Sequence, residues 1–192
     1  ALRASRHDVE LATTAPGGRG KFENLNALLA AHPAAGRDWL LVVDDDVELP
    51  PRFLDELIAA AERFDLALAQ PAHRLHSHAA WSVTRRRPAA LARRTAFVEI
   101  GPVTLVAARA FGDLLPFPPL RMGWGLDVHW AALAQQRGWR LGVVDAVPVL
   151  HAAAPAAAAY SRAQAIAEAR ALLADRPYLP RDAANRTLRT WR

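Results

Sequence analysis

Short apolar runs alternate along this chain with segments in which apolar residues recur every three or four positions. The clearest case is Trp39–Val43, which is apolar throughout and is followed, after Pro50 and Pro51, by an amphipathic segment ending at Phe64. Such a run is typical of a central parallel strand buried on both faces. The alternation therefore predicts an α/β fold with a single Rossmann-like, mainly parallel sheet and flanking helices.

The same patterns predict the remaining elements. We expect further strands at 7–13, 66–70, 97–108 with a kink at Gly101-Pro102, 140–144 and 147–150. Helices are expected at about 22–32, 126–137 and 161–174, and the stretch 71–94 is expected to be irregular. With no repeat or linker, residues 1–192 are predicted to form one domain, with a core at about 7–151 and a C-terminal helix and basic tail at 160–192.

Composition narrows the class of protein. The 192 residues include no cysteine, which excludes a disulfide scaffold, and no apolar window approaches the roughly 18 residues of a membrane span. We therefore expect a cytoplasmic protein, with the inner face of the membrane as a further possible location. Lys21 is the one lysine among 24 basic residues, so the net charge of +5 depends on arginines, which bind phosphates and carboxylates. Anionic partners are expected.

Three consecutive acids, Asp44, Asp45 and Asp46, end the apolar strand. Open α/β sheets bind ligands just beyond such carboxyl ends. If the strand continues, Asp44 and Asp46 share a face. Hard oxygen ligands suit a divalent cation, Mg²⁺ or Mn²⁺, that bridges to substrate phosphates. An acidic turn that caps the next helix is the plain alternative.

Several motifs together resemble those of the nucleotide-sugar glycosyltransferases of the A fold, family two in particular. These are Gly20-Lys21-Phe22-Glu23-Asn24-Leu25-Asn26, the Asp-x-Asp at 44–46, Gly123-Trp124-Gly125-Leu126-Asp127 and Arg137-Gly138-Trp139-Arg140. The resemblance implies metal-dependent transfer of a sugar from a nucleoside diphosphate sugar to an acceptor hydroxyl on a glycan, lipid or small molecule. It also implies that the chain begins after the first strand of that fold.

The resemblance assigns roles to individual residues. Asp46 and His151 would ligate the metal, and Asp127 would be the general base of an inverting transfer, although helix capping is an equal alternative for Asp127. The family's usual Glu-Asp is Leu126-Asp127 here. The residues expected to bind the nucleotide sugar are Gly20, Lys21, Asp44, Asp45 and Trp124, the last with Trp81 as a candidate platform for sugar stacking.

Other interpretations stay open. A Mg²⁺-dependent phosphohydrolase could use the Asp-x-Asp, but it normally needs a downstream lysine, and Lys21 lies upstream. The arginines at 85–87, 93 and 94 could grip a diphosphate, contact an anionic membrane or form a solvated loop. An arginine-rich anion-binding module without enzymatic activity is the third interpretation. A nucleic-acid partner is not expected, because few aromatic residues are interleaved with the arginines. His73, His76 and His78 are read as a polar loop, with a second metal site or an acceptor pocket as alternatives.

Overall fold

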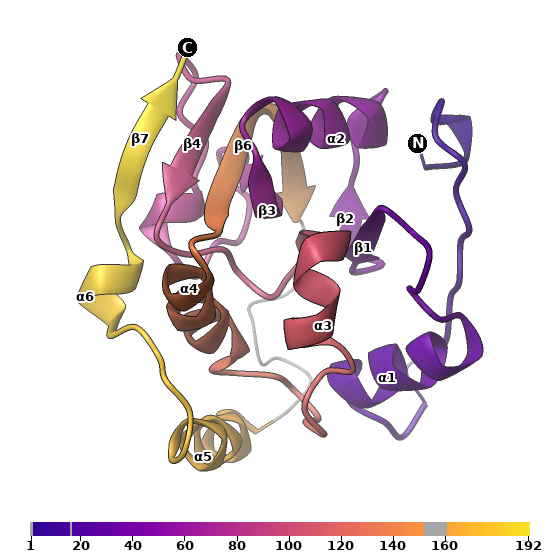
Figure 1. Cartoon of the computed structure of the whole chain (residues 1–192), viewed down its shortest axis with the longest axis vertical. Coiled ribbons are helices and arrows are strands. Elements are labelled where there is room, and N and C mark those ends of the chain that lie inside the picture. Colours follow the sequence, from indigo (N-terminus) through magenta and orange to yellow (C-terminus); the bar gives the residue numbers. More distant parts are fainter. Residues whose placement is uncertain (1, 16, 152–160) are drawn as a thin grey trace.

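A computed structural model describes residues 2–15, 17–151 and 161–192. One sheet lies between helices on both of its faces (Figure 1). The helices are α1 (Lys21–Ala31), α2 (Phe53–Arg63), α3 (Phe111–Leu114), α4 (Leu126–Arg137), α5 (Arg162–Leu173) and α6 (Arg181–Ala184). The strands are β1 (Trp39–Val43), β2 (Val47–Glu48), β3 (Leu66–His73), β4 (Ala92–Thr95), β5 (Val103–Ala107), β6 (Arg140–His151) and β7 (Thr187–Trp191).

The sheet is mixed and mostly antiparallel, so the prediction of a Rossmann-like, mainly parallel sheet is wrong. Its strand order is β1-β5-β3-β6-β4-β7, with β2 paired to the end of β6. Among the described strands, only β3 and β6 pair in parallel. The sheet is mixed because two antiparallel strands lie among the parallel ones. β5 is inserted between β1 and β3, and β4 lies beyond β6, each antiparallel to its neighbours. Apolar alternation identifies strands but not the neighbours with which they pair.

Strand direction nevertheless gathers several chain segments at one edge of the sheet. Because β5 is antiparallel to both β1 and β3, and β3 is parallel to β6, the strands β1, β3 and β6 all run the same way. Their carboxyl ends therefore meet beside the start of β5. We call this the site edge and define it by residues 44–46, 73, 100–102 and 151.

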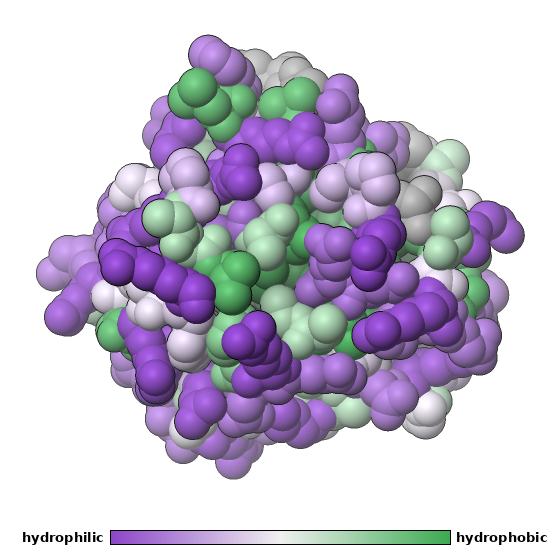
Figure 2. All heavy atoms as spheres, turned by 90° about the horizontal axis from the view of Figure 1, so that it is seen from above, coloured by the Kyte–Doolittle hydropathy of each residue, from purple (hydrophilic) through white to green (hydrophobic). Residues whose placement is uncertain are grey.

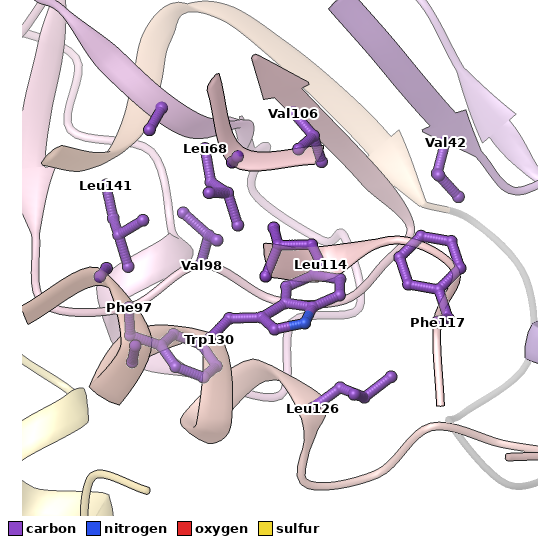
Figure 3. Close-up of a cluster of buried hydrophobic side chains, with 14 of the residues drawn as sticks. Val42, Leu68, Phe97, Val98, Val106, Leu114, Phe117, Leu126, Trp130 and Leu141 are labelled. Carbon is purple, nitrogen blue, oxygen red and sulfur yellow. The ribbon is translucent and has the colours of Figure 1, made fainter. Parts of the chain in front are cut away.

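Two apolar cores cover the two faces of the sheet. Leu105 and Val106 are neighbours on β5 but belong to different cores, as alternation along a strand requires. The core containing Leu105 is completed by the inner face of α2, and the core containing Val106 by residues of α1, α4 and α5. In the second core Leu126 and Trp130 of α4 belong to one buried cluster with Phe97, and the Trp130 ring lies between Phe97 and Phe117 (Figure 3).

The helices agree well with the sequence-based expectation, and the strands less so. α1, α2 and α4 lie where predicted, and Gly138 ends α4 with φ of 68° in the left-handed region. The expected strand at 7–13 is wrong, because these residues belong to no helix or strand. The strands expected at 140–144 and 147–150 are one continuous strand, β6, and part of the predicted tail is β7.

The face of the molecule seen in Figure 2 is largely polar, with hydrophilic side chains around a smaller group of apolar ones. Within residues 2–15, 17–151 and 161–192, no helix has the length and apolar character needed to cross a bilayer.

Candidate functional site

The acidic cluster forms a tight turn instead of extending the strand. β1 ends at Val43, residues 45 and 46 make the turn, and β2 begins at Val47. The N–H of Asp44 donates to the carbonyl of Pro102 at 2.8 Å, which ties the turn to the start of β5. The expected sharing of one strand face by Asp44 and Asp46 therefore does not apply, and the two carboxylates have different partners.

Asp44 pairs with the only lysine of the chain. The Nζ atom of Lys21 lies 2.7 Å from Oδ1 of Asp44 and donates to the carbonyl of Ile100 at 3.2 Å. Gly101 lies against this pair, since a Cβ there would be 2.5 Å from Nζ and 3.1 Å from Oδ2. The first residue of α1 thus reaches the site edge, and the ion pair remains about a quarter exposed.

Asp46 pairs with His151. Residue 47 is directly opposite His151 in the β2–β6 ladder, which brings the acidic turn to the end of β6. Oδ2 of Asp46 lies 3.1 Å from Nε2 of His151. Two adjacent ligands on an octahedral cation, each about 2.1 Å from it, would be roughly 3 Å apart. The pair therefore fits two neighbouring ligands of one small divalent cation.

Protein ligands alone would leave most of the coordination shell open. Among the described residues, no group of three or more Asp, Glu, His or Cys side chains could hold an ion. A magnesium site with one or two protein ligands takes the remainder from water and phosphate. The backbone of His151 is held by two hydrogen bonds: its N–H donates to Ser77 Oγ at 2.9 Å, and its carbonyl accepts from the His78 N–H at 3.1 Å. The neighbouring Asp45 is exposed.

Asp127 is the second residue of α4. Gly125, with φ of 93°, is the N-cap, so Asp127 is not the cap that the alternative interpretation suggested. One carboxylate oxygen accepts from the Val128 N–H at 2.9 Å. Burial of the carboxyl group raises the pKa of Asp127 to about 7, against the opposing effect of the Val128 hydrogen bond and with an added contribution from the negative charge of Glu99. An acid with this pKa can accept a proton near neutral pH.

The turn before α4 is fixed by α5. The Glu168 carboxylate accepts the backbone N–H groups of Arg121 at 2.7 Å and Gly123 at 2.8 Å. Gly123 has φ of 82°, and a Cβ there would come within 2.1 Å of the Phe22 ring. Gly20, the N-cap of α1, meets the same turn, because its Cβ would be 2.3 Å from the Arg121 carbonyl oxygen. These contacts hold the beginnings of α1 and α4 together.

Two residues named with the site have different surroundings. Trp124 is half-buried in the turn directly before α4. The Trp81 ring packs on Phe97, with centroids 4.3 Å apart, and the Arg181 guanidinium lies 4.5 Å from the ring centroid. Trp81 is therefore a partly buried residue packed against the core that contains Val106, and its ring is already in contact with other side chains.

The three histidines do not form one cluster. His73 is buried and contacts Glu99, His76 is exposed with φ of 68°, and the His78 ring lies 6.0 Å from that of His151. A metal site shared by the three histidines therefore has no support within the described residues. The sequence did not predict that His73 contacts Ser77 and Glu99. A signal existed, since Glu99 is the one acid in the apolar run Ala96–Ile100.

The arginine-rich stretch divides into a buried and an exposed part. Arg93 is fully buried and makes a two-point contact with Asp145, from Nε at 2.8 Å and Nη2 at 3.0 Å. It also donates to the carbonyls of Val83 and Arg85. Arg93 therefore has a structural role in the interior, whereas residues 85–87 are exposed.

No model of a known protein family matches the chain, and a search of curated proteins found no match.

Proposed function

We propose that this chain transfers a sugar from a nucleoside diphosphate sugar to an acceptor hydroxyl, with a divalent cation held by Asp46 and His151. The observation that carries the proposal is the 3.1 Å approach of these two side chains at the site edge, beside the ion pair of Lys21 and Asp44. The proposal depends on these residues and not on the fold class, since the sheet is mostly antiparallel.

Each residue has a chemical task. Asp44 is partly exposed and can accept hydrogen bonds from the ribose, while the Lys21 ammonium can contact a phosphate oxygen. Asp127 takes the proton of the acceptor hydroxyl as its oxygen bonds to the anomeric carbon. The bond from that carbon to the diphosphate breaks, and its electron pair leaves with the diphosphate. The cation would stabilise the charge that develops on the leaving group. Attack opposite the leaving group inverts the anomeric configuration.

Metal binding is the first test. Calorimetry with Mn²⁺ should detect one site, and Asp46→Asn and His151→Gln should each weaken it at least about tenfold, the effect of losing roughly 1.4 kcal/mol. Glu48→Gln is the matched control, because it removes an exposed charge two residues from Asp46 and should change the affinity little. Equal affinity in Asp46→Asn and wild type would reject the metal assignment.

Catalysis is tested by the release of nucleoside diphosphate from a panel of nucleotide sugars with Mn²⁺, with water standing in for the acceptor. Asp127→Asn keeps the shape and the Val128 contact but removes the base, and a general base is typically worth on the order of 10² to 10⁴ in rate. If no nucleoside diphosphate binds in the presence of Mn²⁺, the proposed function is wrong. Turnover near the wild-type rate in Asp127→Asn would reject the role of Asp127.

One contact favours a second function. A phosphohydrolase that uses an aspartyl nucleophile needs a lysine beside its strand-end carboxylate, and Lys21 occupies that place 2.7 Å from Asp44. On this hypothesis, incubation with acetyl phosphate and Mg²⁺ would add one phosphoryl group to Asp44, detectable by mass spectrometry and absent in Asp44→Asn. Sugar transfer predicts no such adduct.

A further inference from the structure

Glu99 is a buried carboxylate on the segment between β4 and β5, and the proposed reaction gives it no task. Its exposure is 7%. Oε1 accepts from Thr84 Oγ1 at 2.9 Å and from the Trp81 N–H at 3.2 Å, and Oε2 lies 3.2 Å from Nε2 of His73. A buried carboxylate is tolerated when it is hydrogen-bonded in this way. Both oxygens therefore have fixed partners.

The contacts continue from His73 to the candidate metal ligand. Nδ1 of His73 lies 3.3 Å from Ser77 Oγ, and Ser77 Oγ accepts the backbone N–H of His151 at 2.9 Å. Because the ionised Glu99 carboxylate can only accept, Nε2 of His73 carries a hydrogen. In the neutral ring Nδ1 is then an acceptor for the Ser77 hydroxyl at 3.3 Å, and the other acceptor near this hydroxyl, the His78 carbonyl, is more distant at 3.5 Å. One directed chain of hydrogen bonds thus joins His151 to Glu99.

Glu99 also acts on Asp127. Phe97 and Val98, which precede Glu99, lie in one core with Leu126 and Trp130 on either side of Asp127 (Figure 3). The charge of Glu99 raises the pKa of Asp127.

Other charged groups around α4 have their own contacts. Glu168 of α5 holds the 121–123 turn, Arg181 of α6 lies over Trp81, and Arg137 at the far end of α4 pairs with Asp113. His129 contacts the carbonyl of Pro177. The negative charge of Glu99 adds to the effect of burial, which is the main cause of the raised pKa of Asp127.

We propose that Glu99, held by His73, is a positioning residue that links the two halves of the candidate site. Through His73 and Ser77 it fixes the backbone at His151, and through Phe97 and Val98, which share a core with Leu126 and Trp130, its segment packs beside the part of α4 that carries Asp127. The place of Asp127 in the site depends on the proposed function, since it assumes that Asp127 is a base.

The test is Glu99→Gln, compared with the exposed Glu62→Gln as a matched control. We follow the Asp127 carboxyl by ¹³C NMR, assigned with Asp127→Asn, and the His73 ring by ¹⁵N NMR. In Glu99→Gln the midpoint of the Asp127 titration should fall by about half a pH unit or more, because the negative charge of Glu99 is lost. The Gln amide would donate to Nε2 of His73, so the ring should change from the Nε2–H to the Nδ1–H tautomer. Glu62→Gln should change neither.

An unchanged Asp127 midpoint in Glu99→Gln would overturn the proposal. If that variant does not fold, the ¹⁵N spectrum of the wild-type protein still tests the proposal, because an Nδ1–H tautomer of His73 would contradict the directed chain of hydrogen bonds. Ser77→Ala should weaken Mn²⁺ binding and leave the Asp127 midpoint in place. None of the NMR measurements needs sugar transfer, so shifts as expected without donor turnover would reject the proposed function alone. Turnover with an unshifted midpoint would reject this inference alone.

Discussion

At the scale of single residues, Asp127 has a measurable effect on stability. Its pKa is about 7 in the folded chain, against 3.8 for an ordinary aspartate. Between these values the folded state retains a proton that the unfolded state has lost, so the free energy of unfolding falls as the pH rises from about 4 to 7. The slope from one such group is at most about 1.4 kcal/mol per pH unit.

Asp127→Asn should remove this contribution. The stability of the variant relative to wild type, measured by urea unfolding at several pH values, should increase between pH 4 and 7 and be level above pH 7. Asp8→Asn provides the control, since the Asp8 side chain is 97% exposed. A stability difference for Asp127→Asn that does not vary with pH would mean that the carboxyl group is not buried in an environment that favours its protonated form.

At the scale of elements, the buried pair of Arg93 and Asp145 joins β4 to β6. Each side chain is fully buried, and Asp145 also accepts the Arg87 N–H at 2.7 Å. Arg93→Met would leave the Asp145 charge buried without its partner, which typically costs about 3–5 kcal/mol. Arg94→Met, one residue along the same strand, should cost much less because Arg94 is only half-buried.

A double variant separates charge from packing in this pair. Adding Asp145→Asn to Arg93→Met should recover part of the lost stability, because the unpaired charge is removed while the amide oxygen can still accept from Arg87. Chemical denaturation of all three proteins measures the recovery. If Arg93→Met is no less stable than Arg94→Met, the pair does not hold the two strands together.

At the scale of the whole molecule, the C-terminal strand completes the sheet. β7 pairs with β4, and the Trp191 ring stacks on Phe64 with centroids 4.4 Å apart and an interplanar angle of 15°. Trp191→Ala should therefore cost about 2–3 kcal/mol, less than for a fully buried tryptophan. Removing 187–192 should cost more, since β4 also loses its pairing with β7 and keeps only its pairing with β6. Thr190→Ala, an exposed change in the same strand, is the control. Thermal unfolding measures both proteins. A shortened chain with the same melting temperature as wild type would contradict this role of β7.

The sequence by itself determined the local structure and the chemistry available to it. Helical periodicity and glycine placement located α1, α2 and α4, because both depend on residues close together in the chain. The place of Asp44 and Asp46 after an apolar strand marked them as candidate ligands, and the motif resemblance added Lys21 and His151. The structure brings these four residues together in pairs. Their roles in sugar transfer remain predictions.

Only the tertiary structure decided which strands are neighbours and which side chains meet. Strand pairing is set by contacts between distant residues, so the insertion of β5 between β1 and β3 has no signature in apolar alternation. The turn at 44–46 gives Asp44 and Asp46 separate partners because β1 ends and β2 pairs with β6. The contact between Glu99 and His73 also depends on the tertiary structure. A buried charge requires partners, and the fold determines which residues are near enough to provide them.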